Sequence, residues 1–409
     1  MYDVIVVGAR CAGSPVAMLL AQRGHRVLVV DSATFPSDTV STHYIHQSGL
    51  VRLRTWGLLD EVTAKTPAIR HMEFAYRGTE LSGFADPVDG IDAVYCPRRT
   101  VLDEILVNAA RRAGAEVVEG FTVSDLVFSE GRVVGVRGRE CGRPEREFRA
   151  SVVIGADGYR STVARKTGAE LYKVRPAAGA NYYAYYSGLD AGLHHKVGLK
   201  GSWLGVWPTN DGLTMLALIV NRRLLTAFRQ DVEAGFLDVV DEVTPQVGEQ
   251  LRDQGKREGD FVPMRYADNY YRRAWGPGWA LLGDAGYHKD PYTGFGITDA
   301  FVHADLLADR LDQVLSGGRP MDSALAEYQK IRDETSAAAY DLTVAMSEFT
   351  ELPPMLRTML AAMSTSQEWT NKLFGLFAGG VPHGDIFSRE AVEKLYDDTG
   401  LPEEQRVYG

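Results

Sequence analysis

Apolar runs, turns and a helical pattern alternate over the first thirty residues. Residues 3–7 form a short β-branched run, which predicts a buried strand. A glycine-containing turn follows at 8–13, and residues 15–23 have the apolar spacing of a helix. Residues 25–30 predict a second strand, which ends at the acid Asp31. This order of elements is typical of a dinucleotide-binding βαβ unit.

Similar patterns recur along the chain. Helical spacing is found in four further segments, residues 50–62, 101–113, 224–240 and 297–315. Two more buried strands are predicted at 115–118 and 279–282, and residues 121–156 have the pattern of a small antiparallel meander.

Two further segments have the pattern of short strands and turns rather than of alternating strands and helices. Residues 69–95 alternate short strands with turns, and residues 181–186 form an aromatic strand. Residues 202–207 and 213–220 are joined by a turn with a strong hairpin signal. Residues 69–95, and the stretch from about 176 to 264 that contains the other strands, are interpreted as two excursions into a second domain.

We therefore predict an α/β protein with a Rossmann-like nucleotide-binding domain that is discontinuous in sequence. Its sheet is mixed and carries the small meander, an α+β substrate domain is inserted, and a helical region ends the chain. The predicted nucleotide-binding domain covers 1–68, 97–175 and 265–322; the substrate domain covers 69–96 and 176–264; the helical region covers 323–409.

Composition and charge narrow the class of protein. The 409 residues are 45% hydrophobic and 24% charged, as in ordinary globular proteins. A formal net charge of −10 disfavours a nucleic-acid partner. No apolar run is long enough for a membrane span, and the three cysteines lack metal-type spacing. We expect a cytoplasmic protein without stable membrane insertion and without a metal site.

The first turn carries the chemistry of a dinucleotide site. Gly8 and Gly13 permit a tight turn that directs a helix N-terminus at a diphosphate. Asp31 lies 31 − 8 = 23 positions after Gly8, close to the spacing of about 20 at which an acid binds ribose hydroxyls. The middle glycine of the usual fingerprint is Arg10. Its guanidinium either pairs with phosphate or faces solvent. With the whole chain considered, we predict that Arg10 faces the diphosphate or the mouth of the cofactor pocket rather than bulk solvent.

Two later motifs place further polar groups at strand ends. Asp157-Gly158 follows one predicted strand and Gly283-Asp284 follows another. Residues 291–296, a proline- and glycine-rich turn, then precede the long helix. Backbone N–H groups in such a turn, backed by a helix N-terminus, stabilise negative charge on a bound group.

With these three motifs in this order, the chain resembles the FAD-dependent, p-hydroxybenzoate-hydroxylase-like flavoproteins, which include the group A aromatic monooxygenases. The resemblance covers roughly residues 1 to 315. It implies FAD as cofactor and assigns FAD contacts to Gly8, Arg10, Cys11, Ala12, Gly13, Asp31, Arg99, Asp157, Gly283, Asp284, Pro291, Gly294, Gly296 and Ile297.

The chain departs from the family pattern at several positions. Arg10 replaces a glycine, and Cys11 stands where proline is usual. Residues 286–288 replace a more common Ala-His, and Thr298 stands where asparagine is usual. These departures leave FAD binding in place but leave the type of reaction open.

Aromatic residues in the inserted domain are candidates for the substrate site. At the period of two of a strand, Tyr183 and Tyr185 share one face of it. With Trp203 and Trp207 they are predicted to line a substrate pocket, the alternative being ordinary sheet core. The candidate catalytic residues are His43, Tyr44 and His288.

The resemblance implies a monooxygenase that transfers one oxygen atom from O2 to an aromatic or polycyclic small molecule through a flavin C4a-hydroperoxide. NAD(P)H is the expected reductant; a separate flavin reductase and a homodimer stay open as partners. A reductase of the geranylgeranyl-reductase type is the main alternative. A flavin halogenase is disfavoured because residues 38–50 contain no lysine and residues 203–208 only approach the motif W-x-W-x-I-P. A non-catalytic flavoprotein is a further alternative.

Overall fold

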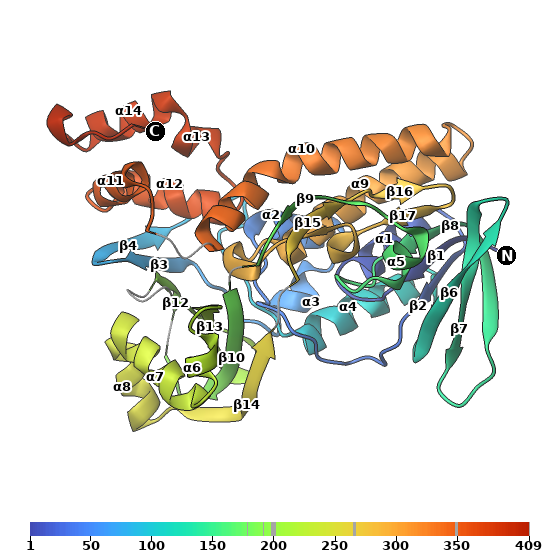
Figure 1. Cartoon of the computed structure of the whole chain (residues 1–409), viewed down its shortest axis with the longest axis horizontal. Helices are drawn as coiled ribbons and strands as arrows, with labels where there is room; N and C mark the ends of the chain where they lie inside the picture. The colour runs from blue at the N-terminus through green and yellow to red at the C-terminus, as the bar shows by residue number, and fades with distance from the viewer. Residues whose placement is uncertain (178, 191, 198–201, 265–266, 348–350, 409) are drawn as a thin grey trace.

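In the computed structural model, two large sheets are linked by long helices (Figure 1). The structure describes residues 1–177, 179–190, 192–197, 202–264, 267–347 and 351–408. The mixed α/β architecture agrees with the fold class predicted from the sequence.

The N-terminal sheet is built around a parallel core with the strand order β16-β17-β8-β1-β2-β5. Its strands are β1 (Tyr2–Val7), β2 (Val27–Val30), β5 (Glu116–Val118), β8 (Arg146–Gly155), β16 (Trp275–Gly276) and β17 (Trp279–Leu281). The meander adds β6 (Phe121–Ser129) and β7 (Arg132–Glu140), which pair with each other and, through β7, with β8. β1 and β2 are apolar and almost wholly buried, as expected for parallel strands that are covered on both faces.

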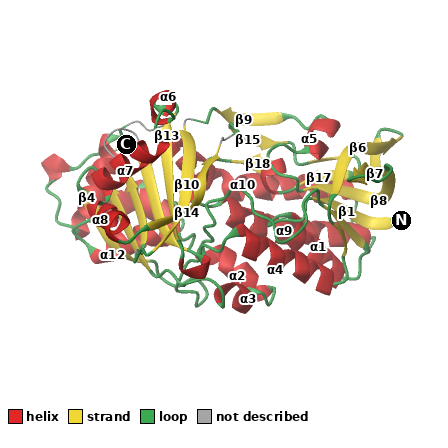
Figure 2. Ribbon diagram, turned by 90° about the horizontal axis from the view of Figure 1, so that it is seen from below, coloured by secondary structure: helices red, strands yellow, loops and turns green. Residues whose placement is uncertain are grey.

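Three helices cover one face of this sheet: α1 (Gly13–Gln22), α4 (Arg99–Arg112) and α9 (Gly296–Leu315). α1 packs against both α4 and α9 (Figure 2). α9 also packs against α2 (Gln47–Thr55) and against the long helix α10 (Met321–Ser347). The N-termini of α1 and α9 therefore come from one helical layer.

The second sheet has the order β14-β10-β13-β12-β11-β3-β4 and draws strands from two distant segments. They are β3 (His71–Tyr76), β4 (Thr79–Phe84), β10 (Gly179–Ser187), β11 (Leu193–Val197), β12 (Ser202–Pro208), β13 (Thr214–Asn221) and β14 (Lys256–Met264). β3 joins this sheet by parallel pairing with β11. The exact division of the chain into domains stays a prediction.

The two faces of the second sheet have different covers. One packs on α6 (Leu225–Phe228), α7 (Val232–Val243) and α8 (Pro245–Asp253), with Tyr182 and Tyr186 in that core. The other, which carries Tyr183 and Tyr185, packs on the C-terminal helices. Those helices are α11 (Pro354–Met363), α12 (Gln367–Phe377), α13 (Gly384–Phe387) and α14 (Arg389–Asp398).

Three short strands form a further sheet with the order β18-β15-β9. They are β9 (Leu171–Arg175), β15 (Asn269–Arg272) and β18 (Tyr287–His288). α5 (Thr162–Thr167) precedes β9. Among the described residues, no helix combines the length and apolar character needed to cross a membrane.

Two predicted helices are each divided in the structure. The segment 50–62 becomes α2 and α3 (Leu59–Thr63), because Gly57 at φ +73° ends the first helix. The segment 224–240 becomes α6 and α7, and the Asp231 side chain caps α7 by accepting from the backbone N–H of Ala234. In both cases a local turn interrupts the helix, and the spacing of apolar residues alone does not show such a turn.

Candidate functional site: a dinucleotide cavity

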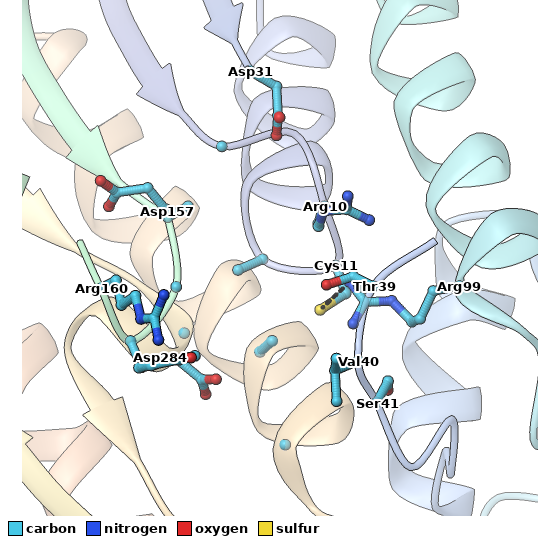
Figure 3. Close-up of a pocket in the computed structure, with 18 of the residues that line it drawn as sticks. Arg10, Cys11, Asp31, Thr39, Val40, Ser41, Arg99, Asp157, Arg160 and Asp284 are labelled. Atoms are coloured by element: carbon cyan, nitrogen blue, oxygen red, sulfur yellow. Dashed lines mark hydrogen bonds between the residues drawn. The ribbon is translucent and has the colours of Figure 1, made fainter. Parts of the chain in front are cut away.

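A cavity of about 790 Å³ lies at the carboxyl ends of β1, β2 and β8. This edge of a parallel sheet is where α/β proteins bind nucleotides. In Figure 3, Asp157, Arg160 and Asp284 lie on one side of the site, and Cys11 and Arg99 lie on the other. The cavity continues to Pro263 and Met264 at the end of β14, so it connects the two sheets.

The first glycine turn leaves no room for a side chain at Gly8 or at Gly13. Gly8 has φ +102°, and a Cβ there would lie 2.4 Å from the carbonyl oxygen of Ala156. A Cβ on Gly13 would lie 1.8 Å from the carbonyl oxygen of Gly8. The turn therefore brings the start of α1 against β1, with Cys11 and Ala12 at the cavity wall.

Asp31 fixes this turn and also lines the cavity. Its Oδ2 accepts from the backbone N–H of Ala9 (2.7 Å), and its Oδ1 accepts from the N–H of Ala33 (2.8 Å). Each carboxylate oxygen retains lone-pair capacity for a further donor. This is the position and chemistry needed to accept from ribose hydroxyls.

Arg10 and Arg99 meet at one buried carboxylate. Asp103, with a fully buried side chain, accepts from Arg10 Nη1 at Oδ2 (2.8 Å) and from Arg99 Nε at Oδ1 (3.0 Å). Arg99 Nη2 also lies 3.5 Å from Cys11 Sγ, and burial raises the pKa of that thiol to about 11. Both arginines line the cavity. Asp103 did not emerge from the sequence as a site residue, although it lies four positions after Arg99 on one helix, a spacing typical of ion pairs.

Asp157 lines the cavity, but its carboxylate is directed at the start of α5. Its Oδ1 accepts from Ser161 Oγ (2.6 Å) and its Oδ2 from the N–H of Thr162 (2.6 Å). Burial raises its pKa, and these hydrogen bonds oppose the rise. In this structure Asp157 orders the turn that contains Gly158. A Cβ on Gly158 would meet no other part of the protein within 4 Å, which leaves an open approach to this backbone.

Asp284 and His288 line the cavity next to each other. The Asp284 side chain is 45% exposed, and its Oδ2 lies 3.4 Å from His288 Nδ1. The His288 side chain is 9% exposed and lies near the rings of Tyr159 and Tyr270, at 5.8 and 5.6 Å between centroids. Neither ring nitrogen has a hydrogen-bond partner within the described parts of the chain. A buried imidazole whose nitrogens make no hydrogen bond of their own, at a cavity wall, is suited to bonding a ligand.

The third motif forms the turn at the N-terminus of α9. Pro291, Gly296 and Ile297 line the cavity. Gly294, at φ +70°, instead faces Tyr44: a Cβ on Gly294 would lie 3.2 Å from the Tyr44 side chain. A Cβ on Gly296 would meet no protein atom within 4 Å. The helix N-terminus at Gly296 is thus accessible from the cavity.

Lys289 and Asp299 form a buried ion pair behind this turn. The Lys289 side chain is 3% exposed; its Nζ bonds the Asp299 carboxylate and donates to Tyr287 Oη (2.8 Å). Burial raises the pKa of Asp299, and Lys289 opposes that rise. Sequence reasoning did not select this pair, since its ten-residue separation crosses from a loop into a helix.

Of the other two candidate catalytic residues, neither His43 nor Tyr44 is among the residues that line the cavity. His43 is fully buried at φ +62°, and its Nε2 is hydrogen-bonded to Tyr185 Oη. Burial, reinforced by Arg99 and Arg98, lowers its pKa to about 3. Such an imidazole stays neutral at physiological pH and is a weak base. A catalytic role for His43, Tyr44 or His288 stays a prediction.

The four predicted substrate residues lie in one buried cluster. Tyr183, Tyr185, Trp203 and Trp207 pack with the C-terminal helices and are outside the described lining of the cavity. The cluster nevertheless reaches the third motif, because the ring of Trp203 lies 5.1 Å from that of Tyr292. Their contact with substrate stays a prediction.

Comparison with known families decides what the cavity binds. The model of the FAD binding domain family matches residues 1–343, most of the chain. The chain belongs to this FAD-binding family. The prediction made from the three motifs is confirmed at the level of family and cofactor, and the protein is an FAD-dependent oxidoreductase.

Relatives of known activity differ in chemistry. The chain is 26% identical over 363 residues to digeranylgeranylglycerophospholipid reductase of Methanosarcina mazei, covering 84% of this chain and 83% of the relative. It resembles the structure of the myxobacterial chondrochloren halogenase (TM-score 0.77, 23% identity, 99% and 98% of the two chains). It also resembles a probable FAD-dependent monooxygenase from Pseudomonas aeruginosa (TM-score 0.72, 22% identity, 91% and 99%). The two structural likenesses establish the fold.

The residues present fit FAD. Asp31 offers acceptors for the adenosine ribose, the start of α1 faces the middle of the cavity, and Asp284 with the Gly296 turn forms its other end. The described residues include no group of three or more His, Cys, Asp or Glu that could hold a metal ion.

Proposed function

We propose that this oxidoreductase is a monooxygenase that adds one oxygen atom from O2 to an aromatic or polycyclic small molecule, with NAD(P)H as reductant. Reduced FAD supplies the electrons that activate O2. The chain's own contribution is then to bind the organic substrate, keep water away and orient the reacting ring.

The observation that carries this proposal is the junction between the aromatic face of the second sheet and the FAD cavity. Tyr185 bonds His43, and Trp203 contacts Tyr292 in the turn before α9. Flat aromatic side chains stack on flat aromatic ligands at favourable ring distances. The cavity end at Pro263 and Met264 lies on β14, which pairs with β10, the strand that carries Tyr183 and Tyr185, so a substrate at this end would lie close to the aromatic face.

The polar groups at this junction suit a neutral or phenolic substrate. His43 is neutral because burial keeps its pKa near 3, and burial raises the pKa of Tyr183 to about 12. Neither group changes its charge between pH 5 and 9, so both stay uncharged over that range.

A reductase is the second candidate, and the named activity of the Methanosarcina mazei relative favours it. The two reactions differ in their use of oxygen. A monooxygenase places one atom of O2 in the product and releases the other as water. A reductase adds hydrogen to a carbon–carbon double bond and does not need O2.

One experiment separates these candidates. Purified holoenzyme is supplied with NADPH or NADH and screened against phenols, polycyclic aromatics and a geranylgeranyl lipid, under 18O2 and under argon. We expect oxygen uptake and a product heavier by one labelled oxygen with an aromatic substrate. Saturation of the lipid under argon, without labelled product, would contradict monooxygenation. A product that forms only when chloride or bromide is present would indicate halogenation.

A second test concerns the aromatic face. Tyr185→Phe removes the hydroxyl that bonds His43 and retains the ring. We expect a raised KM for the aromatic substrate with an unchanged flavin content. Tyr186→Phe, on the opposite face of the same strand, is the matched control because its ring belongs to the α6–α8 core.

A further inference from the structure

The segment 35–42, here named the rim segment, forms part of the cavity wall without being helix or strand. Thr39, Val40, Ser41 and Thr42 line the cavity, and Val40 is 40% exposed. In Figure 3, Thr39, Val40 and Ser41 lie on the same side of the cavity as Cys11 and Arg99. Because no ladder of backbone hydrogen bonds fixes this segment, its position depends on side-chain contacts.

Arg10 supplies most of those contacts. Its Nη1 donates to the carbonyl oxygen of Ser37 (3.3 Å), and its Nη2 donates to Ser37 Oγ (2.9 Å) and to the carbonyl oxygen of Asp38 (3.4 Å). Its guanidinium also lies over the ring of Phe35, 5.4 Å from the centroid. A planar guanidinium with five donors can hold several acceptors at once, which a glycine at this position could not do.

Asp103 in turn fixes Arg10. Its side chain is fully buried, and its two oxygens are divided between Arg10 on the first turn and Arg99 on α4. A buried carboxylate with charge-assisted bonds to both partners holds each guanidinium in one orientation. Arg98, the neighbour of Arg99, adds a weaker contact to the rim segment, with Nη2 3.9 Å from Asp38 Oδ2.

We propose that Asp103 and Arg10 form a latch that holds the rim segment against the FAD cavity, so that the latch sets how slowly FAD leaves. Arg10 acts through its hydrogen bonds to Ser37 and Asp38 of the rim segment. Asp103 is a positioning residue that acts through Arg10. The latch depends on the FAD site of the family and is independent of which reaction the flavin performs.

The test measures FAD release directly. Holoenzyme is diluted, and the return of flavin fluorescence gives the dissociation rate. Loss of a charge-assisted hydrogen bond should speed release about ten-fold or more in Arg10→Ala. Arg10→Lys keeps a charge for Asp103 but cannot form the fork to Ser37, so its rate should lie between those of Arg10→Ala and the unaltered protein. Arg26→Ala, which removes an exposed pair with Asp3 outside the cavity lining, is the control and should leave the rate unchanged.

Two further variants separate the latch from other roles. Ser37→Ala removes an acceptor of Arg10 at a half-buried loop position outside helices and strands, and should fold normally; it should also speed release. Amide hydrogen exchange of residues 35–42 in the holoenzyme should rise in Arg10→Ala and in Asp103→Asn.

The opposite results are equally informative. If Arg10→Ala speeds release but Ser37→Ala and exchange of 35–42 are unchanged, Arg10 holds FAD directly and the latch is wrong. An unchanged release rate in both Arg10→Ala and Ser37→Ala also overturns it. If Asp103→Asn does not fold, the Ser37→Ala and Arg10→Lys rates still decide the question.

Discussion

His288 Nδ1 lies 3.4 Å from Asp284 Oδ2, at the end of the cavity that Gly283 and Asp284 help to form. The contact joins the 3₁₀ turn Gly283–Ala285 to β18 and directs a half-exposed carboxylate into the FAD site. Removing this carboxylate should remove the flavin. We expect Asp284→Ala to be purified with much less FAD, visible as a lower ratio of absorbance at the flavin band to that of the protein.

Asp309→Ala is the matched control for this prediction. Asp309 lies on α9 and pairs with Arg23 on the surface, outside the cavity lining. A normal flavin content in Asp284→Ala would show that Asp284 does not hold FAD.

Two helices begin with a glycine that has open space beside it, one at the cofactor cavity and one outside it. A Cβ on Gly296 of α9 or on Gly384 of α13 would meet no protein atom within 4 Å, but only Gly296 lines the cavity. We expect Gly296→Ala to leave the stability of the apoprotein unchanged and to raise the Kd for FAD, measured by quenching of flavin fluorescence. Gly384→Ala should change neither quantity. Equal FAD affinity in the two variants would place the flavin elsewhere.

Burial of His43 makes folding stability depend on pH. Its pKa is about 3 in the folded protein and 6.5 in the unfolded chain, so the unfolded state binds the extra proton between these values. Stability is therefore fully present above pH 6.5 and falls as the pH drops toward 3, by at most about 1.4 kcal/mol per pH unit for this one group. His303, whose pKa is also lowered to about 3 by burial, adds a loss of the same sign.

His43→Asn should make the decline of stability between pH 6.5 and 4 less steep, measured by urea unfolding at several pH values. Asparagine tolerates the left-handed conformation that His43 adopts at φ +62°. His71→Asn, at an exposed position on β3, should leave the slope unchanged. A slope unaffected by His43→Asn would show that His43 is not a buried neutral group.

Breaking the Lys289–Asp299 pair should be costly because it leaves a charge buried without its partner. We expect Lys289→Met to lower the free energy of unfolding by about 3 kcal/mol or more, and Lys289→Met with Asp299→Leu to recover part of that loss. Chemical unfolding of the apoproteins measures both. Lys394→Met, which breaks the exposed pair with Asp398 on α14, is the control and should have little effect. No recovery in the double variant would mean that the pair has another role.

Sequence patterns predicted the features that depend on near neighbours. Gly8, Gly13 and Asp31 lie within one βαβ unit, and the structure places them as that unit requires. The period of two also separated the two faces of β10, with Tyr183 in one core and Tyr182 in the other.

Contacts between residues far apart in the sequence could not be predicted from these patterns. Asp103 joins Arg99 four positions away, but its bond to Arg10 spans 93 positions and follows from the packing of α1 on α4. The left-handed backbone of His43 has no glycine to signal it, and its bond to Tyr185 spans 142 positions. Sequence periodicity cannot report which elements meet in three dimensions.

The C-terminal helices close the aromatic face of the second sheet from the side opposite α6–α8. Trp369 and Phe374 of α12 are buried in the same cluster as Tyr183 and Trp203, although the family match ends at residue 343. If this face contacts substrate as proposed, part of the substrate wall is therefore encoded after the stretch that the family model matches. On that proposal, exchanging residues 354–398 for those of a relative should change substrate choice and leave FAD binding unaltered, because no residue of the described range 354–398 lines the FAD cavity.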